Sequence, residues 1–267
     1  MPLRVQILGS SSGGNCALVE TGESRFLIDA GFSGRKIEGM LAARGLSARD
    51  LDAVLVTHEH TDHAAGIRGL AKFEQLEFFA TPDTASAIQR GLKRAVPWRT
   101  FQSGQRFRLR DCVVEALKLP HDAYDPVGFV VTTGRPDDLF DPLRQVAWVT
   151  DLGHIPAGLG ERLKSVDLLV LEANHDDDLL DDDPHRPFSV KQRIRGTHGH
   201  LSNATAAQFL RETDLPRIKH VCLGHLSTDC NDPAEVRKTF GAHCGGAPIH
   251  IVPPGETPSA VFELSGF

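Results

Sequence analysis

The chain has 267 residues, of which 40% are hydrophobic and 24% charged, with 25 glycines and 16 prolines. These values are typical of a globular α/β protein with a substantial core, and no apolar run reaches the length of a membrane span. The formal net charge of −6 argues against a surface that binds nucleic acid broadly, but it permits a local basic groove.

The predicted elements alternate between strands and helices along the whole chain. Strands are predicted at 3–10, 16–20, 25–31, 51–60, 107–122, 127–134, 144–153, 166–176, 219–225 and 248–252. Helices are predicted at 34–45, 63–73, 84–95, 203–214 and 233–241. No repeat, low-complexity linker or break in composition divides the chain, so a single domain over 1–267 is predicted. The opening MPLRVQILGSSSGG lacks a secretory layout, which predicts a cytoplasmic protein.

Five of the predicted strands end in polar pairs or triplets. The endings read LVTHEH, LKLPHD, AWVTDLGH, LVLEANHD and VCLGHLS. In sheets covered by helices, ligand sites form where loops leave the strand ends, because rigid strands aim several side chains at one point. Five such endings therefore predict one shared site.

The heptapeptide THEHTDH at 57–63 holds three histidines and two carboxylates. Alternate residues of an extended segment point the same way, so His58 and His60 are predicted to converge on one ion. Asp62 and His63 then face a neighbouring position as the chain turns into the next helix. Metal binding is a far better interpretation of this heptapeptide than surface histidines or helix caps.

Three later strand ends supply further ligand types, namely His121, Asp151 and His225. Asp151 is the natural bridging group, because it follows a strand and offers two oxygens. The full set has imidazoles and carboxylates but no thiolate, which suits two divalent ions, Zn²⁺ first and Mn²⁺ or Fe²⁺ next. For each later residue alone, a surface or capping role remains an alternative.

The five cysteines are scattered and form no CxxC pair. They therefore predict neither a disulfide framework nor a thiolate zinc site. The chain also has no GxSxG motif, so no side-chain nucleophile is evident.

The motifs taken together resemble the metallo-β-lactamase superfamily over nearly the whole chain. Within it, EANHD and GHLSN narrow the resemblance to the YycJ/WalJ-like group of small bacterial nucleases. The resemblance implies a four-layered αβ/βα sandwich, a dinuclear site and 5′-to-3′ exonuclease activity, on DNA more than on RNA. The matching segments are GSSSGGNCALVE, LIDAGFSGRKIEGML, VTHEHTDH, PHDA, VTDLGH, LEANHD, FSVKQRIRGTHGHLSN and GHLSTDCND.

The resemblance also implies a division of the ligands between two metals. It places His58, His60 and His121 on one ion, and Asp62, His63 and His225 on the other. Asp151 would lie between them. Two adjacent ions lower the pKa of a shared water, so a bridging hydroxide is expected to attack phosphorus near neutral pH. Asp62 is a candidate for orienting that hydroxide.

The segment THGHLSN at 197–203 is the second predicted catalytic element. Related ribonucleases use a comparable Gly-His loop near the scissile phosphate, so His200 is predicted to stabilise the leaving or non-bridging oxygen. Ser202 and Asn203 are candidates for binding substrate at a helix start. The alternative is that they only cap the following helix.

Supporting and substrate-binding residues are harder to assign. Asn174, His175 and His154 are candidates for hydrogen-bonding a ligand imidazole, although a turn or surface role is an equal alternative. The basic stretch 186–200 is the candidate groove for the nucleic-acid backbone, with a solvated helix face as the alternative. Its candidate contacts are Lys191, Arg193 and Arg195.

The acidic run at 176–183 departs from the resemblance, because six aspartates would repel a phosphate backbone. It is predicted to be a solvated loop that points away from the groove. No oligomeric state follows from the sequence.

Two other functions compete with the nuclease. One is hydrolysis of a small ester or thioester, of the glyoxalase II kind, and the other is a non-catalytic, metal-stabilised interaction protein. The complete ligand set disfavours the second, and the basic stretch with GHLSN disfavours the first. Too few positions separate Asp151 from His225 for an inserted β-CASP domain.

Overall fold

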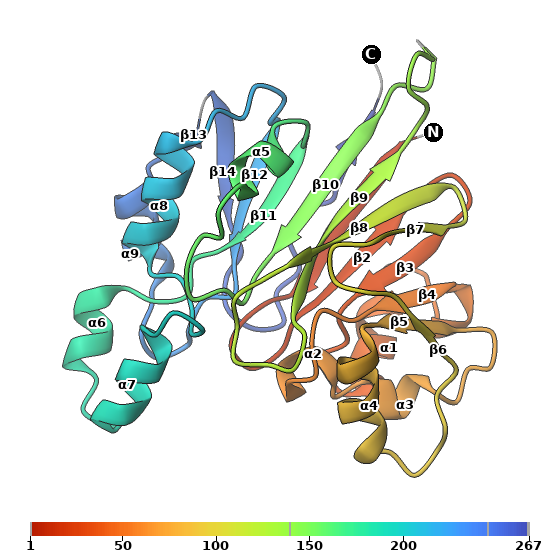
Figure 1. Ribbon diagram of the computed structural model, residues 1–267, viewed down its shortest axis with the longest axis horizontal. Helices are drawn as coiled ribbons and strands as arrows, with labels where there is room; N and C mark the ends of the chain where they lie inside the picture. Colours follow the sequence, from red (N-terminus) through yellow and green to blue (C-terminus); the bar gives the residue numbers. More distant parts are fainter. Residues whose placement is uncertain (1, 139, 245, 266–267) are drawn as a thin grey trace.

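Two mixed β-sheets form the centre of the molecule (Figure 1). The structure is a computed structural model that describes residues 2–138, 140–244 and 246–265. In the described chain, the first sheet has the order β15-β1-β2-β3-β4-β5-β6, and its strands are parallel from β3 to β6. Its strands are β1 (Leu3–Gly9), β2 (Cys16–Glu20), β3 (Arg25–Ile28), β4 (Ala53–Leu55), β5 (Glu77–Ala80), β6 (Trp98–Thr100) and β15 (Phe262–Leu264).

The second sheet has the order β13-β14-β12-β11-β10-β9-β8-β7 among the described residues. Strands β10, β11, β12 and β14 are parallel, and β7 to β10 are antiparallel. Its strands are β7 (Arg106–Leu109), β8 (Cys112–Lys118), β9 (Val127–Thr133), β10 (Arg144–Val149), β11 (Leu168–Glu172), β12 (His220–Gly224), β13 (His243–Cys244) and β14 (Ala247–Ile251).

Helices cover the outer face of each sheet (Figure 1). Helices α1, α3 and α4 lie beside the first sheet, and α5, α8 and α9 lie beside the second. The helices are α1 (Gly34–Ala42), α2 (Thr61–Ala64), α3 (Ile67–Leu70), α4 (Pro82–Arg90), α5 (Leu159–Leu163), α6 (Asp177–Asp182), α7 (Phe188–Ile194), α8 (Asn203–Glu212) and α9 (Pro233–Phe240), with a 3₁₀ turn at Ala48–Asp50.

Three apolar clusters show how these layers are held together. The central cluster joins the facing sides of the two sheets and includes the fully buried Phe26 and Trp148. The two outer clusters join each sheet to its helices, through Ile37 on one side and Phe209 on the other. Strand β11 is buried at every position, as expected for a parallel strand covered on both faces. The four-layered αβ/βα sandwich predicted from the sequence is thereby confirmed.

Several predicted elements differ in their boundaries. The segment 107–122, predicted as one strand, contains most of a hairpin, because the chain reverses at Arg110, whose φ is +49°. Strands β5, β6, β13 and β15 were not predicted at all. No helix within the described residues has the length and apolar character needed to cross a membrane.

The predicted helix at 63–73 is interrupted, and the interruption matters for the site. The amide N–H of Gly66 donates to the carbonyl of Ala30 at 2.7 Å, and the carbonyl of Asp62 accepts from the amide of Asn15 at 2.8 Å. These two groups would otherwise bond each other in a continuous helix, so the chain splits into α2 and α3. The same contacts fix the backbone of Asp62.

Substituting Gly31 should disturb this junction. A Cβ at Gly31 would lie 1.7 Å from the carbonyl oxygen of Asp62, so the backbone must move. We expect Gly31→Ala to lower the free energy of unfolding by about 2–3 kcal/mol. The matched control is Gly39→Ala in α1, where the Cβ meets nothing within 4 Å and stability should rise by about 0.5–1 kcal/mol. Chemical denaturation measures the stability of both variants. Equal effects at the two positions would contradict the role of Gly31 in the contact with Asp62.

Candidate metal centre

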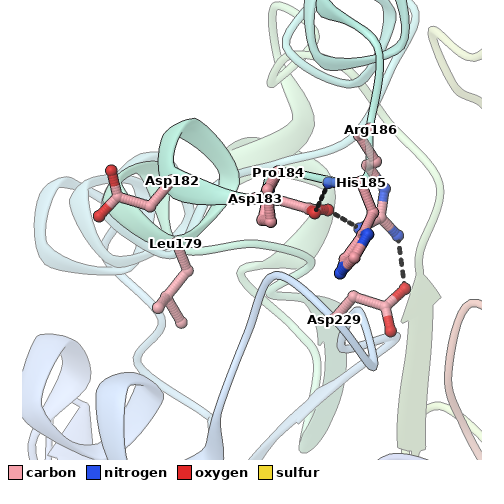
Figure 2. A pocket seen from close by; sticks show the side chains of 7 residues that line it. All are labelled: Leu179, Asp182, Asp183, Pro184, His185, Arg186 and Asp229. Atoms are coloured by element: carbon pink, nitrogen blue, oxygen red, sulfur yellow. Dashed lines mark hydrogen bonds and ion pairs between the residues drawn. The ribbon is translucent and has the colours of Figure 1, made fainter.

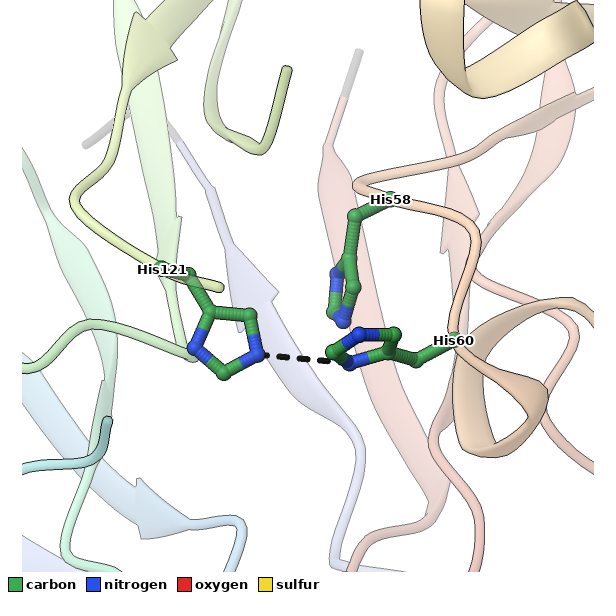
Figure 3. A group of neighbouring side chains, drawn as sticks. All are labelled: His58, His60 and His121. Carbon is green, nitrogen blue, oxygen red and sulfur yellow. Dashed lines mark hydrogen bonds between the residues drawn. The ribbon is translucent and has the colours of Figure 1, made fainter. Parts of the chain in front are cut away.

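Three imidazoles meet at the edge where β4 and β8 end. His58 and His60 come from the loop after β4, and His121 follows β8 (Figure 3). One nitrogen from each ring lies within 4.8 Å of the others, and the Nε2 atom of His121 is 3.3 Å from Nδ1 of His60. Strand β4 ends at Leu55, so the two heptapeptide histidines converge from a bent loop and not from an extended strand.

A second group lies beside the first and contains Asp62, His63 and His225. The Nε2 atoms of His63 and His225 are 3.3 Å and 3.5 Å from Oδ2 of Asp62. Asp62 and His63 lie in the short helix α2, while His225 directly follows β12. All three side chains therefore point to one place from two sheets.

Asp151 contacts both groups. Its carboxylate oxygens lie 3.3 Å from Nε2 of His225, 3.4 Å from Nε2 of His63 and 3.9 Å from Nε2 of His121. The residue is buried and has a φ of +65°, and His225 has a φ of +56°. Non-glycine residues in this left-handed region are strained, so the surrounding structure must enforce both conformations.

The donor atoms at the centre fit divalent cations. Within the described residues, Nε2 of His58, Oδ2 of Asp151 and Nε2 of His225 are buried and form no hydrogen bond of good geometry, although they lie close to other members of the centre. An unpartnered buried polar atom costs about 1–3 kcal/mol, and here three such atoms converge. Imidazole nitrogen and carboxylate oxygen are ligands of Zn²⁺ and similar ions, so a cation at this place would satisfy all three.

Charges within the cluster perturb the pKa values strongly. Burial lowers the pKa of His63, but Asp151, Asp29 and Asp62 outweigh it and raise the pKa well above its usual value. Burial also lowers the pKa of His225, but Asp151 outweighs this effect and the pKa rises to about 10. Burial raises the pKa of Asp151, yet His225 and His63 hold it well below its usual range. Without a metal ion, protons on His63 and His225 balance the negative charge of the carboxylates. Binding of a cation would release these protons.

Two buried carboxylates orient the imidazoles from behind. Asp29 accepts a hydrogen bond from Nδ1 of His63 at 2.8 Å, and Oε1 of Glu172 accepts one from Nδ1 of His225 at 2.8 Å. Each leaves Nε2 of its histidine directed at the metal position. The sequence prediction missed both residues, although each is an acidic residue closing an apolar strand, in FLIDAG and LVLEANHD.

Glu172 also connects the centre to the predicted catalytic histidine. Its Oε1 accepts from Nδ1 of His200 at 2.8 Å, and its Oε2 accepts from the amides of Leu152 and Leu201. These four donors occupy the carboxylate of Glu172, so it is better suited to anchoring than to binding a metal. His200 lies beside His225, with ring centroids 5.3 Å apart, and it lines the cleft over the centre.

Only one of the three predicted supporting residues contacts a candidate ligand in the described structure. Asn174 donates to the carbonyl of His225 at 3.0 Å. His175 is buried and its carbonyl accepts from the amide of Asn203, but its ring contacts no candidate ligand. His154 is exposed and bonds the carbonyl of Thr197. The geometry does not support a role for His175 or His154 in orienting an imidazole.

Ser202 and Asn203 occupy structural positions. The hydroxyl of Ser202 caps α8 by accepting from the amide of Thr205, and the amide of Asn203 exchanges hydrogen bonds with Asn231. Both are buried, so their polar groups need hydrogen-bond partners within the protein. The helix-capping alternative describes them better than substrate binding does.

The acidic run is helix α6, and it pairs with the basic stretch instead of pointing away. Arg195 contacts Asp181 at 2.6 Å, and Lys191 donates to the carbonyl of Asp181. Figure 2 shows Arg186 between Asp183 and Asp229, which lies on the loop after His225. The predicted loop was wrong, and α6 engages two of the three predicted backbone-binding cations, Lys191 and Arg195.

A cleft of about 210 Å³ opens over the centre. Arg193 of α7 reaches it and pairs with Asp122 from the loop that carries His121. Helix α7 has no buried residue, and its Val190 and Ile194 also line the cleft. The remaining lining residues are His60, Asp62, His121, Asp151, His200, His225, Ser12 and Gly199.

The fold and this site define a hydrolase of the metallo-β-lactamase superfamily. The model of the β-lactamase superfamily domain matches residues 24–226. Exodeoxyribonuclease YycJ of Bacillus anthracis is 32% identical over 234 residues, which are 86% of this chain and 85% of that protein. Exodeoxyribonuclease WalJ of Streptococcus pneumoniae is 32% identical over 85% of this chain and 83% of its own. The chain belongs to the YycJ/WalJ family.

Solved structures share the fold at lower identity. YhfI from Bacillus subtilis, a metallo-β-lactamase fold protein, has a TM-score of 0.73 and 21% identity, covering 98% of this chain and 99% of its own. A diphosphatase of the PhnP family has a TM-score of 0.67 and 18% identity, with 99% and 100% covered. At these identities the likeness concerns the fold alone.

Replacing Glu172 with Gln should weaken metal binding. The amide NH₂ of Gln would face N–H donors of the two histidines or the backbone, so His225 would lose its fixed orientation. We expect metal affinity to fall about 10- to 100-fold in a chelator competition assay. Glu161→Gln, which removes an exposed carboxylate paired with Lys164, is the control and should leave the affinity unchanged. Wild-type affinity in Glu172→Gln would contradict the anchoring role.

Proposed function

We propose that the protein is a dinuclear metal-dependent 5′-to-3′ exonuclease that hydrolyses phosphodiester bonds of DNA. The observation that carries this proposal is the pair of ligand triads joined by Asp151, in a chain whose family includes proteins named exodeoxyribonucleases. In this scheme His58, His60 and His121 hold one ion, and Asp62, His63 and His225 hold the other. Zn²⁺ and Mn²⁺ are the first candidates.

When bound, such a pair of cations supplies Lewis-acid stabilisation of phosphoryl oxygens and a water of lowered pKa. The side chains of this protein fix where that chemistry occurs. Asp151 and the six triad residues define the position of the phosphate, and Asp62, at the cleft surface, is placed to orient the attacking water. Five of the seven ligands are buried, and only His60 and Asp62 are half-buried, which keeps these groups from rearranging.

His200 is the candidate general acid. Glu172 holds its Nδ1, so Nε2 is directed to the cleft and can donate a proton or hydrogen bond to the leaving oxygen. A sugar alkoxide is a poor leaving group and needs such a proton. A thiolate leaves without one, because thiols ionise near pH 8.5. The Glu172–His200 pair therefore favours a phosphodiesterase over a thioester hydrolase of the glyoxalase II kind.

Removing a ligand tests the metal-dependent chemistry. His60→Ala should lower hydrolysis of 5′-labelled DNA at least about 1,000-fold, because transition-state stabilisation of several kcal/mol is lost. Thermal unfolding should stay cooperative. Chelation of the wild-type protein should abolish hydrolysis, and Zn²⁺ or Mn²⁺ should restore it. His243→Ala, at an exposed histidine of β13, is the control.

The substrates should include single- and double-stranded DNA, bis(p-nitrophenyl) phosphate and a thioester. Faster hydrolysis of the thioester than of any phosphodiester would overturn the proposal. So would undiminished DNA hydrolysis by metal-stripped His60→Ala protein.

His200→Ala separates catalysis from metal binding. Loss of a general acid should lower kcat on DNA about 100- to 10,000-fold, while metal content stays at the wild-type value. His198→Ala, an exposed histidine on the same loop, should retain full activity. If metal content falls with kcat in His200→Ala, then His200 is a metal ligand and not the acid.

A further inference from the structure

A group of exposed cations lies beside the metal centre on the side away from α7. We call Arg68, Arg90, Lys93, Arg94 and the aromatic Tyr124 the rim patch. All five side chains are exposed, Tyr124 at 66%. Arg68 precedes the end of α3, Arg90 ends α4, and Lys93 and Arg94 follow in the loop to β6.

Direct contacts join the rim patch to the metal centre. The amide of Tyr124 donates to Oε1 of Glu59 at 3.0 Å, and Glu59 lies between the candidate ligands His58 and His60. The guanidinium of Arg90 lies over the Tyr124 ring, 5.5 Å from its centroid. This cation–π pair at the edge of the site leads directly into the loop that carries Lys93 and Arg94.

Three cations of the rim patch line a concave surface. A cavity of about 340 Å³ is lined by Arg68, Lys93 and Arg94 together with Ala71, Gly91 and Leu92. Arg68 donates to the carbonyl of Gly91 at 3.1 Å, which ties α3 to the loop after α4. Arg68, Lys93 and Arg94 are thus presented around a defined hollow.

These cations differ from those near α7 in their contacts with carboxylates. Within the described residues, no carboxylate lies within 4.0 Å of the side-chain nitrogens of Arg68, Arg90, Lys93 or Arg94. Arg186, Arg193 and Arg195, by contrast, all contact aspartates. In a chain with a formal net charge of −6, uncompensated positive charge beside the metal centre is the feature that would attract an anion.

We propose that the rim patch binds the single-stranded part of a nucleic-acid substrate next to the scissile phosphate. This inference rests on the proposed nuclease function. Tyr124, backed by Arg90, offers a stacking surface for a base, and Arg68, Lys93 and Arg94 bind successive phosphates. The combination of an aromatic ring with spaced cations fits a nucleic-acid strand better than an acidic peptide, which has no bases to stack.

Neutralising two cations provides the main test. Binding of a 5′-fluorescein-labelled dT20 to the chelated wild-type protein and to Lys93→Gln/Arg94→Gln is followed by anisotropy across KCl concentrations. Losing two phosphate contacts should reduce the slope of log K against log salt by about 1.4 and weaken binding about 10-fold or more at low salt. Arg211→Gln/Arg237→Gln is the matched control, with two exposed cations on α8 and α9, on the opposite side of the molecule (Figure 1).

Tyr124 tests stacking separately from charge. Tyr124→Ala should weaken dT20 binding about 10-fold with an unchanged salt slope, while Tyr124→Phe, which keeps the ring, should stay within about 2-fold of wild type. The bond from Tyr124 to Glu59 uses the main chain, so neither substitution removes it. Poly-L-glutamate that competes as well as dT20, at equal charge, would overturn the proposal in favour of an acidic polypeptide.

Turnover distinguishes this inference from the proposed function. In Lys93→Gln/Arg94→Gln, the ratio of kcat/KM for dT20 to kcat/KM for bis(p-nitrophenyl) phosphate should fall about 10-fold, and the α8/α9 control should keep the wild-type ratio. An unchanged ratio and salt slope in a protein that does hydrolyse DNA would overturn the rim patch alone. A wild-type protein that binds dT20 through the rim patch but hydrolyses no phosphodiester would overturn the nuclease function alone.

Discussion

The site depends on buried carboxylates that hold imidazoles by their Nδ1 atoms. Asp29 and Glu172 are fully buried, and each accepts from a histidine that belongs to the candidate metal centre. A buried charge is tolerated only when it is paired and hydrogen-bonded, so these carboxylates force the imidazoles into one orientation. The consequence is that the Nε2 atoms of His63 and His225 both face the carboxylates of Asp62 and Asp151 at the candidate metal position. That arrangement is costly without a cation and favourable with one.

The fold was accessible from the sequence because local patterns agreed with the global architecture. Continuous apolar runs such as LLVLE predicted strands, and the polar residues after them predicted the shared site. The short strands β5, β6, β13 and β15 were missed because two to four residues carry too little periodicity. The interruption between α2 and α3 was missed for another reason. It is set by hydrogen bonds to Ala30 and Asn15, which are distant in sequence. The single-domain organisation and the cytoplasmic location stay predictions.

At the site, the sequence predicted the candidate metal ligands but not the carboxylates that orient them by hydrogen bonds. The heptapeptide, His121, Asp151 and His225 converge as expected, because each leaves a strand at the same edge. Asp29 and Glu172 were overlooked because an acidic residue closing a strand has no distinctive spacing. Ser202 and Asn203 resemble ligand-binding residues in the sequence alone. In the structure they are buried, and Ser202 caps α8 while Asn203 bonds Asn231. Only their hydrogen-bond partners in the structure distinguish a capping role from a substrate-binding role.

Charge pairing decides which cations near the cleft are free to bind a substrate. The sequence pointed to Lys191, Arg193 and Arg195 because they lie close together along the chain. That closeness does not show whether their charges are paired with carboxylates. Helix α6 lies beside α7 and brings its aspartates to Lys191 and Arg195, so a phosphate backbone would compete with an existing ion pair or hydrogen bond. Arg68, Lys93 and Arg94 are separated by up to 26 positions and line one hollow only in the fold, while Arg90 lies over the ring of Tyr124. Phosphate binding is favoured where desolvation and existing partners oppose it least, and that is the side of the cleft opposite α7.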